Sequence, residues 1–317
     1  MSPQSFTSDR RRFLNLVGGA ALAAPILGAS NPAFGSSASK AADHVAEFYG
    51  SLSEKQLTTI CFPFEHKLRN RINANWHVTK PRIGEDFYTD AQRDLVKKIL
   101  RSMSSEEGYK RLIQQMDDDY FGVEEYSMAV FGDPEAGEFQ WMLTGRHLTL
   151  RVDGNSIKNS AFGGPIVYGH ADEDPDTNLY HYQTKQTNKV FEALNPEQVK
   201  SALLKKAPRE TDVLLQGANG KFQGLAVKDM ASDQQTLVKE SLQVLLAPYA
   251  EEDSKEVMDL IEQGGGLEKL HMAFYQQGDL KEDKVWDMWR VEGPSLVWNF
   301  RGAPHVHAYI NIGMAKS

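Results

Sequence analysis

The chain has 317 residues, 41% of them hydrophobic and 25% charged, and its formal net charge is −8 at pH 7. This length and composition suit one large core or two coupled ones, and the acidic balance argues against nucleic acid or an anionic membrane surface as a partner. Cys61 is the only cysteine, so an internal disulfide is excluded, and its apolar neighbours predict a packing residue rather than a nucleophile.

The N-terminal segment has the features of an export signal. A run of arginines at positions 10–12 precedes Phe13 and Leu14, which resembles the twin-arginine pattern, and the weakly apolar stretch to Ala29 is too short for a stable anchor. Ala33-Phe34-Gly35 is a small-x-small cleavage candidate. We therefore expect a twin-arginine signal peptide over residues 1–35, export by that machinery to the periplasm or beyond, and no membrane anchor after cleavage. A retained anchor or a Sec leader is the alternative.

Residues 36–317 are expected to form a single domain, with a formal charge of about −10 once the three arginines and one aspartate of the leader are removed. A Ser/Ala linker is expected over 36–42. Helical periodicity and capping signals then predict helices, and alternation between turn residues predicts strands. The helices are expected over 53–60, 91–103, 108–116, from 183, from 196, over 232–246 and over 252–261. The strands are expected over 126–131, 139–143, 147–152, 270–276, 285–292, 295–301 and 305–312.

This order predicts an α+β fold, with mostly antiparallel strands and helices packed around them. Two segments are also similar in detail. The segments from Trp141 to His147 and from Trp298 to His305 both contain Trp-x-apolar-x-Gly, followed by a turn and a histidine that opens a strand. The similarity is either chance or a trace of two similar helix-then-strand halves.

The C-terminal strand carries the strongest chemical signal. Because side chains alternate along a strand, His305, His307 and Tyr309 share one face, opposite an apolar face that begins with Val306. The two histidine Cα atoms are then roughly 6.5–7 Å apart. At that spacing both rings can approach one metal ion.

A mononuclear site needs a third ligand. His147 is the choice, because it opens the strand 147–152; His170 and His271 are the other candidates. Three neutral imidazoles suit a divalent ion, and Cu or Zn is expected. Arg301 and Tyr309 are expected to line the same cleft.

Two further features have ordinary explanations beside the functional ones. Glu65 is a candidate catalytic acid, although its i, i+4 spacing to Arg69 favours an ion pair. The five tryptophans are expected to be core residues, with a sugar or aromatic-ligand platform as the alternative. The sequence contains no Walker, GxGxxG or GxSxG motif, which argues against those nucleotide and serine-hydrolase sites.

Several blocks together resemble the bacterial domain-of-unknown-function 3500 family. They are Phe48-Tyr49-x-Ser51-Leu52-Ser53, Phe62-Pro63-Phe64, Gly145-Arg146-His147-Leu148-Thr149-Leu150, Phe162-Gly163-Gly164-Pro165, Glu292-Gly293-Pro294 and Pro304-His305-Val306-His307. Many relatives carry His-His-Leu-Ser-Leu where this chain has Arg146 to Leu150, so only the second histidine is retained. The resemblance implies that His147, His305 and His307 are family-pattern residues and implies no activity.

Two functions are therefore open, beside a purely structural role in the cell envelope. The first is an exported metalloprotein whose His147, His305 and His307 bind one Cu or Zn ion that is able to activate water or dioxygen, in a hydrolase or an oxidoreductase if the protein is an enzyme. The second is a metal-free envelope protein that binds a small organic or sugar-like molecule. Both expect a small-molecule ligand or substrate.

Overall fold

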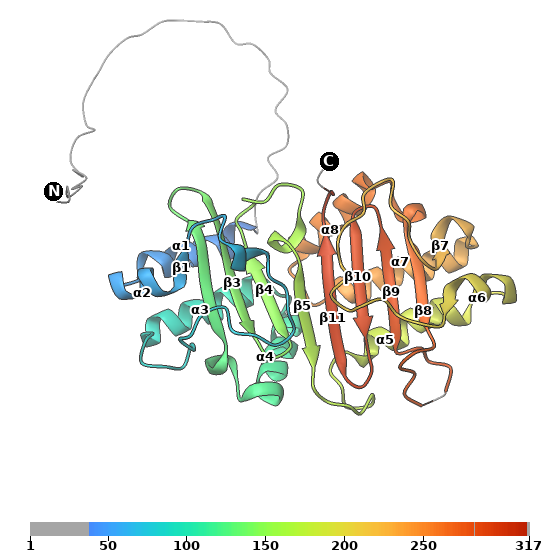
Figure 1. Cartoon of the computed structure of the whole chain (residues 1–317), viewed down its shortest axis with the longest axis horizontal. Coiled ribbons are helices and arrows are strands. Elements are labelled where there is room, and N and C mark those ends of the chain that lie inside the picture. The colour runs from blue at the N-terminus through green and yellow to red at the C-terminus, as the bar shows by residue number, and fades with distance from the viewer. Residues whose placement is uncertain (1–37, 282, 316–317) are drawn as a thin grey trace, which may run out of the picture. The chain divides into compact units, whose positions relative to one another are not determined.

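The computed structural model describes residues 38–281 and 283–315, so the predicted signal peptide and its cleavage site lie outside the described residues. The strands form one 11-stranded sheet in the order β1-β2-β3-β4-β5-β11-β10-β9-β8-β6, with β7 pairing to β8 (Figure 1). Almost every pairing is antiparallel; β1 with β2 and β6 with β8 are parallel. The predicted α+β class is confirmed.

The first half of the chain contributes four helices and five strands to the described residues. The helices are α1 (Ala38–Gly50), α2 (Glu54–Ile60), α3 (Asp90–Ser102) and α4 (Glu106–Tyr120). The strands are β1 (Cys61–Phe62), β2 (Ser127–Asp133), β3 (Glu138–Gly145), β4 (Leu148–Val152) and β5 (Ile166–His170). The linker expected over 36–42 is wrong where it is described, because α1 begins at Ala38 and buries Ala41 and Val45.

The second half adds the same kinds of element. Its helices are α5 (His181–Glu192), α6 (Pro196–Ala202), α7 (Ser232–Leu246) and α8 (Glu251–Gln263). Its strands are β6 (Leu203–Leu204), β7 (Leu225–Ala226), β8 (His271–Tyr275), β9 (Met288–Gly293), β10 (Leu296–Arg301) and β11 (Val306–Ile312). No helix in the described part of the chain is both long and apolar enough to cross a membrane.

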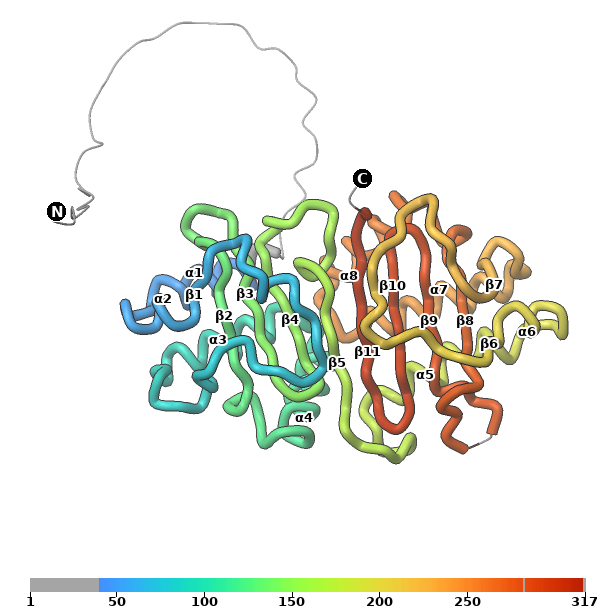
Figure 2. Tube along the Cα trace, viewed as in Figure 1, coloured from blue at the N-terminus to red at the C-terminus, as the bar shows by residue number. Residues whose placement is uncertain are grey.

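The two faces of the sheet are covered differently. The helices pack on one face, while two long segments without regular sheet pairing cross the other: the first strap, residues 63–89, and the second strap, residues 205–224 (Figures 1 and 2). Successive side chains of β11 point to opposite faces of the sheet. Its apolar side chains from Val306 to Ile312 face the helices and join the main core. Tyr309 joins a smaller cluster beneath the straps, with Ala74 and Val213.

The two halves of the sheet have the same strand arrangement when read outward from the central β5–β11 pair. Strands β4, β3, β2 and β1 on one side correspond to β10, β9, β8 and β6 on the other, so a pseudo-twofold axis passes between β5 and β11. Backbone register aligns Met128-Ala129-Val130-Phe131 of β2 with Met272-Ala273-Phe274-Tyr275 of β8, because each strand pairs at matching positions with β1 or β6 on one side and with β3 or β9 on the other. The same register makes Trp141 and Trp289 equivalent positions in the two halves. The alignment of Trp141 with Trp298 expected from the sequence is therefore wrong, although the two similar halves exist.

A glutamine pair repeats in both halves. The Gln56 and Gln92 side-chain amides exchange two hydrogen bonds, at 2.8 and 3.1 Å, and those of Gln198 and Gln234 do the same at 2.9 Å each. Each glutamine also takes the third helical position at the start of α2, α3, α6 or α7, where its side-chain oxygen accepts the backbone N–H of the residue before the helix. The residue before α2, α3 and α6 completes a capping box with its own side chain, whereas Ala231 before α7 has no side-chain acceptor. Helix starts and interhelical contact are thus fixed by the same side chains in each half.

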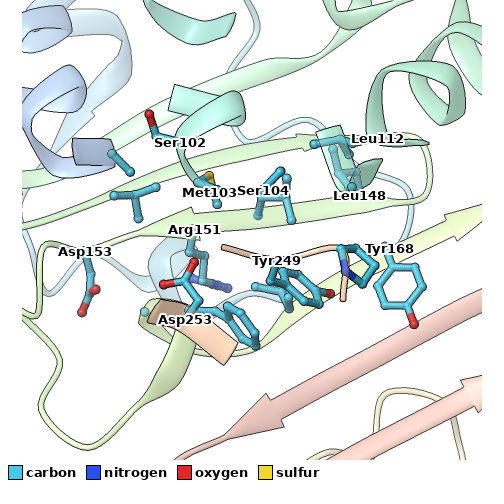
Figure 3. Close-up of a pocket in the computed structure, with 18 of the residues that line it drawn as sticks. Ser102, Met103, Ser104, Leu112, Leu148, Arg151, Asp153, Tyr168, Tyr249 and Asp253 are labelled. Atoms are coloured by element: carbon cyan, nitrogen blue, oxygen red, sulfur yellow. The ribbon is translucent and has the colours of Figure 1, made fainter. Parts of the chain in front are cut away.

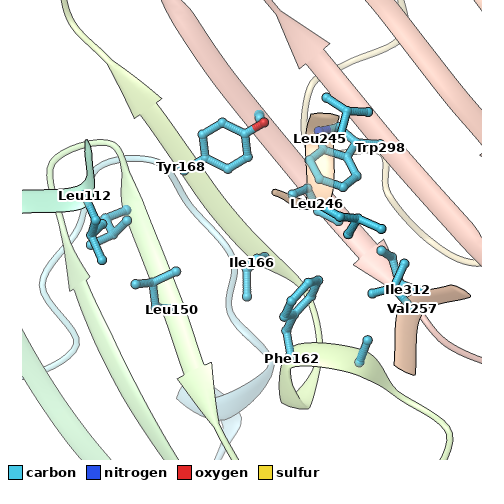
Figure 4. Packing of buried hydrophobic residues seen from close by; sticks show 14 of the residues in the cluster. Leu112, Leu150, Phe162, Ile166, Tyr168, Leu245, Leu246, Val257, Trp298 and Ile312 are labelled. Atoms are coloured by element: carbon cyan, nitrogen blue, oxygen red, sulfur yellow. The ribbon is translucent and has the colours of Figure 1, made fainter. Parts of the chain in front are cut away.

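The core under the helices is rich in aromatic residues. Trp141, Trp289 and Trp298 are fully buried, which confirms the predicted packing role for these three. Figure 4 shows Trp298 beside Leu245 and Leu246 of α7, on one side of Tyr168, and Leu112 with Leu150 on the other. The indole of Trp298 therefore packs in the second half of the core.

Candidate metal centre

His147 occupies the turn between β3 and β4 in a conformation that is unusual for its residue type. Its φ of +54° lies in the left-handed region, which favours glycine and costs other residues on the order of 1 kcal/mol. The backbone N–H of His147 donates to the Ala74 carbonyl of the first strap at 2.5 Å. A buried histidine held in this conformation by a second segment suggests that the imidazole itself is needed there.

His305 and His307 come from the other half of the chain. His307 is in β11, and His305 lies in the turn just before that strand. Because β11 pairs with β5 and β5 pairs with β4, the β10–β11 turn lies at the same end of the sheet as the β3–β4 turn. The pseudo-twofold seam thus brings a histidine of the first half next to two of the second.

The three rings form a nearly equilateral cluster. Ring centroids are 5.0 Å apart for His147 and His305, 4.8 Å for His147 and His307, and 4.9 Å for His305 and His307. One nitrogen from each ring lies within 4.8 Å of the other two. The predicted grouping of these three residues is therefore present, with His147 buried and the other two partly buried.

Two carboxylates set the orientation of two rings. Nδ1 of His147 lies 2.7 Å from Oδ2 of Asp119, at the C-terminal end of α4, and Nδ1 of His307 lies 3.1 Å from Oε2 of Glu210, on the second strap. An ionised carboxylate only accepts hydrogen bonds, so each Nδ1 carries the proton and each Nε2 presents a lone pair. Carboxylate partners of this kind fix the tautomer of metal-binding histidines in proteins.

The third ring completes the arrangement. Nε2 of His305 lies 3.1 Å from Nε2 of His307, and its buried Nδ1 has no hydrogen-bond partner among the described residues. In a tetrahedral site with metal–nitrogen bonds of 2.0–2.1 Å, ligand nitrogens are about 3.3 Å apart. The His305–His307 separation is close to that distance.

Burial favours the neutral imidazole at His305 and His307. It lowers the pKa of His305 to about 4, with smaller contributions from the neighbouring His307, His147 and Arg301 charges. Burial likewise lowers the pKa of His307, although the Glu210 carboxylate opposes the shift. Burial acts to raise the pKa of Glu210, but the hydrogen bond from His307 and the nearby Arg301 outweigh it, so the pKa is lowered. Neutral imidazoles beside ionised carboxylates are the protonation states that a cation requires.

Arg301 and Tyr309 lie on the same side of the sheet as His307. Arg301 pairs directly with His307 across β10 and β11, and its Nε is 3.4 Å from Oε2 of Glu210. Nε and Nη2 of Arg301 are buried and make no hydrogen bond within the described residues. The Tyr309 hydroxyl accepts the Ala74 N–H at 3.0 Å, so the backbone of Ala74 contacts Tyr309 through its N–H and His147 through its carbonyl.

Glu65 does not join this group. Its side chain is 85% exposed and its carboxylate pairs with Arg69 at 3.6 Å, the ordinary alternative considered for it. His170 and His271 also stay outside the cluster: Nδ1 of His170 accepts the Leu179 N–H, and the His271 ring packs against Phe222. Of the candidates for the third ligand, only His147 reaches His305 and His307.

The second half lacks the corresponding histidine. Gly293-Pro294-Ser295-Leu296 between β9 and β10 corresponds to Gly145-Arg146-His147-Leu148 between β3 and β4, so Ser295 replaces His147. Within the described residues, the three-histidine cluster is the one group of ligand side chains close enough to hold an ion. The second half of the chain therefore repeats the fold of the first half but does not repeat the three-histidine cluster.

Asp119 and Glu210 were missed from sequence. Glu210 lies in an irregular segment, where no periodicity marks it. Asp119 ends the run Asp117-Asp118-Asp119 in the last turn of α4, where acidic side chains oppose the helix dipole. This electrostatically unfavourable run of aspartates was the one sequence feature that could have marked Asp119 as a functional residue.

Comparison with known proteins identifies the family. A family model described as "Protein of unknown function (DUF3500)" matches residues 34–311, nearly the whole chain. The chain therefore belongs to this family, as its motifs indicated. Neither the curated proteins nor the solved structures contain a match.

Proposed function

We propose that this member of the DUF3500 family is an exported metalloprotein that binds one divalent ion through Nε2 of His147, His305 and His307. The observation that carries the proposal is the pair of carboxylates, Asp119 and Glu210, each of which holds one ring by Nδ1 and so leaves its Nε2 lone pair for an ion, in a cluster where one nitrogen of each ring lies within 4.8 Å of the others. Lone pairs directed at one another repel unless a cation lies between them.

Zn²⁺ and Cu²⁺ both suit three neutral imidazoles, and the spacing of His305 and His307 fits a tetrahedral ion. The carboxylates of Asp119 and Glu210 add negative charge just outside the ligands. The C-terminal end of α4 adds a partial negative charge of its own. Local charge therefore favours a cation at this place.

Three protein ligands leave a coordination position open, which is typical of catalytic rather than structural zinc sites. Arg301 pairs with Glu210 through Nε at 3.4 Å, and its buried Nη2 makes no hydrogen bond within the described residues, so this guanidinium keeps a donor suited to a carboxylate or another oxyanion. In an enzyme, the ion would supply Lewis acidity for water or dioxygen, and Arg301 would bind and orient an anionic group of the substrate. Hydrolysis and oxidation remain alternatives.

One observation favours the metal-free alternative. If Nε2 of His305 carries its proton, the 3.1 Å contact is a direct hydrogen bond to the Nε2 lone pair of His307. The cluster would then be a polar wall for a small organic or sugar-like ligand. The two functions differ in metal content, which can be measured directly.

Elemental analysis of protein purified from its native compartment tests the proposal. We expect about one ion per chain, and loss of that ion in His305→Ala and in His307→Ala. His271→Ala is the matched control, because His271 is a partly buried strand histidine outside the cluster. Metal-free native protein that also fails to take up Zn²⁺ or Cu²⁺ in vitro would refute the metal site, and a ligand-dependent rise in melting temperature would then support the binding protein.

Export is proposed from the leader sequence alone. A reporter fused to residues 1–40 should be exported, and export should stop when Arg10, Arg11 and Arg12 are all changed to Lys. Export that survives the triple change would remove the twin-arginine route and leave the metal site unaffected.

A further inference from the structure

A pocket lies on the helix-covered face of the sheet, away from the strap-covered face that carries His307. Its floor is formed by β4 and β5, and its walls come from the α3–α4 link, the α7–α8 link and the first turns of α8 (Figure 3). The two links hold each other by backbone hydrogen bonds, from Ser105 N–H to the Pro248 carbonyl and from Ala250 N–H to the Met103 carbonyl. The pocket therefore has a rigid frame at the seam of the two halves.

The pocket exists because the two halves are packed with side chains of different size. The strand register aligns Leu150 of β4 with Trp298 of β10, and Val152 with Phe300. In the second half the indole of Trp298 packs against the ring of Tyr249, whereas in the first half the smaller Leu150 lines the pocket. The pocket measures about 80 Å³, room for about five to eight water-sized groups.

One end of the pocket carries negative charge without a counter-charge. Asp253 and Glu256 line it from one face of α8, and neither carboxylate forms an ion pair or a side-chain hydrogen bond with another described residue. Burial, reinforced by neighbouring carboxylates, raises the pKa of Asp253 to about 7 and that of Glu256 to about 7. Arg151 does not neutralise them, because its N–H groups donate to the side chain of Gln140 and to three backbone carbonyls.

The rest of the lining is mostly apolar. It includes Met103, Leu112, Leu148, Leu150, Phe162 and Ile166. Asp153, the third acidic residue of the lining, already accepts the backbone N–H groups of Asn155 and Ile157, so it is committed to its own turn. The unpaired charge is therefore confined to the Asp253 and Glu256 end.

We propose that this pocket binds a small organic cation: a primary alkylammonium of about five to eight non-hydrogen atoms, with its ammonium at Asp253 and Glu256 and its alkyl chain between Leu150, Leu112 and Leu148. Charge complementarity selects the ammonium, and the apolar walls select the alkyl chain. This site is independent of the three-histidine centre and needs no metal.

Hexylamine is a suitable probe, with 1-hexanol as the neutral molecule of the same shape and hexanoate as the anionic one. Binding is measured by calorimetry and by melting temperature at about pH 8, where both carboxylates are ionised. We expect hexylamine alone to bind and to raise the melting temperature. Asp253→Asn should weaken binding at least about tenfold, because it removes a charge-assisted hydrogen bond.

Two more variants separate the charge from the space. Leu150→Trp copies the residue of the second half, fills the pocket and should abolish binding. Glu251→Gln removes a charge from the exposed first turn of the same helix, outside the pocket, and should bind like wild type. The proposal is overturned if hexylamine fails to bind, if 1-hexanol binds as well, or if Asp253→Asn binds unchanged. Asp253→Asn and the alcohol still decide the question if Leu150→Trp does not fold.

Discussion

Replacing Asp119 by Asn tests whether the cluster is built for an ion. Oδ1 of Asp119 accepts the backbone N–H of Ala171 at 2.7 Å, and Oδ2 faces Nδ1 of His147 at 2.7 Å. An asparagine has one oxygen. If that oxygen keeps the bond to Ala171, the amide NH₂ must face Nδ1 of His147 as a donor. Nδ1 then has to accept, so the proton moves to Nε2 and the lone pair for the ion is lost.

The size of the effect follows from this tautomer change. Loss of a carboxylate partner behind a histidine ligand typically lowers metal affinity 10- to 100-fold, about 1.4–2.7 kcal/mol. The amide is nearly the same size as the carboxylate, so we expect the buried packing around Asp119 to survive. The expected result is a folded protein with weakened metal binding.

The assay is competition for Zn²⁺ against a chromophoric chelator, together with nitrogen NMR of the His147 tautomer in the metal-free protein. Asp118→Asn is the control: Asp118 is the neighbouring residue, its side chain is 48% exposed, and it lies 3.5 Å from His170 rather than from a cluster histidine. Unchanged zinc affinity in Asp119→Asn, with Nε2 protonated, would refute the reasoning. So would an equal loss in the control.

Three further predictions concern stability. Asp253→Asn should stabilise the protein by up to about 4 kcal/mol near pH 8 and have little effect near pH 4 in urea unfolding; equal effects at both pH values would contradict it. The sign follows because the folded-state pKa of Asp253 is raised from 3.8 to about 7: its ionisation destabilises the fold progressively from about pH 4 to 7 and fully above pH 7. Trp298→Ala should cost about 3–5 kcal/mol, since the fully buried indole leaves a cavity, and a cost below 1 kcal/mol would show that the core collapses around it. Gln92→Ala should cost about 1–3 kcal/mol because it removes the two buried hydrogen bonds with the Gln56 amide, whereas Gln92→Glu keeps an acceptor for Nε2 of Gln56 and should regain part of that loss; identical melting temperatures for the two variants would contradict this.

Local sequence signals predicted most elements, because capping boxes and alternation act within a few residues. β5 was missed: Ile166–His170 is short, contains Gly169 and follows Gly163-Gly164-Pro165. Its identity as a strand depends on pairing with β11, a partner from the far end of the chain. The sequence also indicated two similar halves, but it matched Trp141 of β3 with Trp298 of β10 instead of Trp289 of β9. The Trp, Gly and His residues of the two segments coincide in spacing, although the backbone positions are not equivalent.

The same distinction explains the site. His305 and His307 were found because alternation along one strand is local, and His147 because it opens another strand. The partners Asp119 and Glu210 come from a helix end and an irregular strap, and only tertiary structure brings them to the rings. The pocket near Leu150 was invisible for a related reason: a void results from the volumes of side chains on many elements, and no single residue encodes it.

The seam between the halves gives the cluster a second consequence. One ligand comes from the first half and two from the second, so a bound ion would cross-link two repeats that already share the β5–β11 pairing and one hydrophobic core. A cross-link between positions distant in sequence restricts the unfolded chain more than a local one does. Loading would therefore raise the melting temperature of both repeats together.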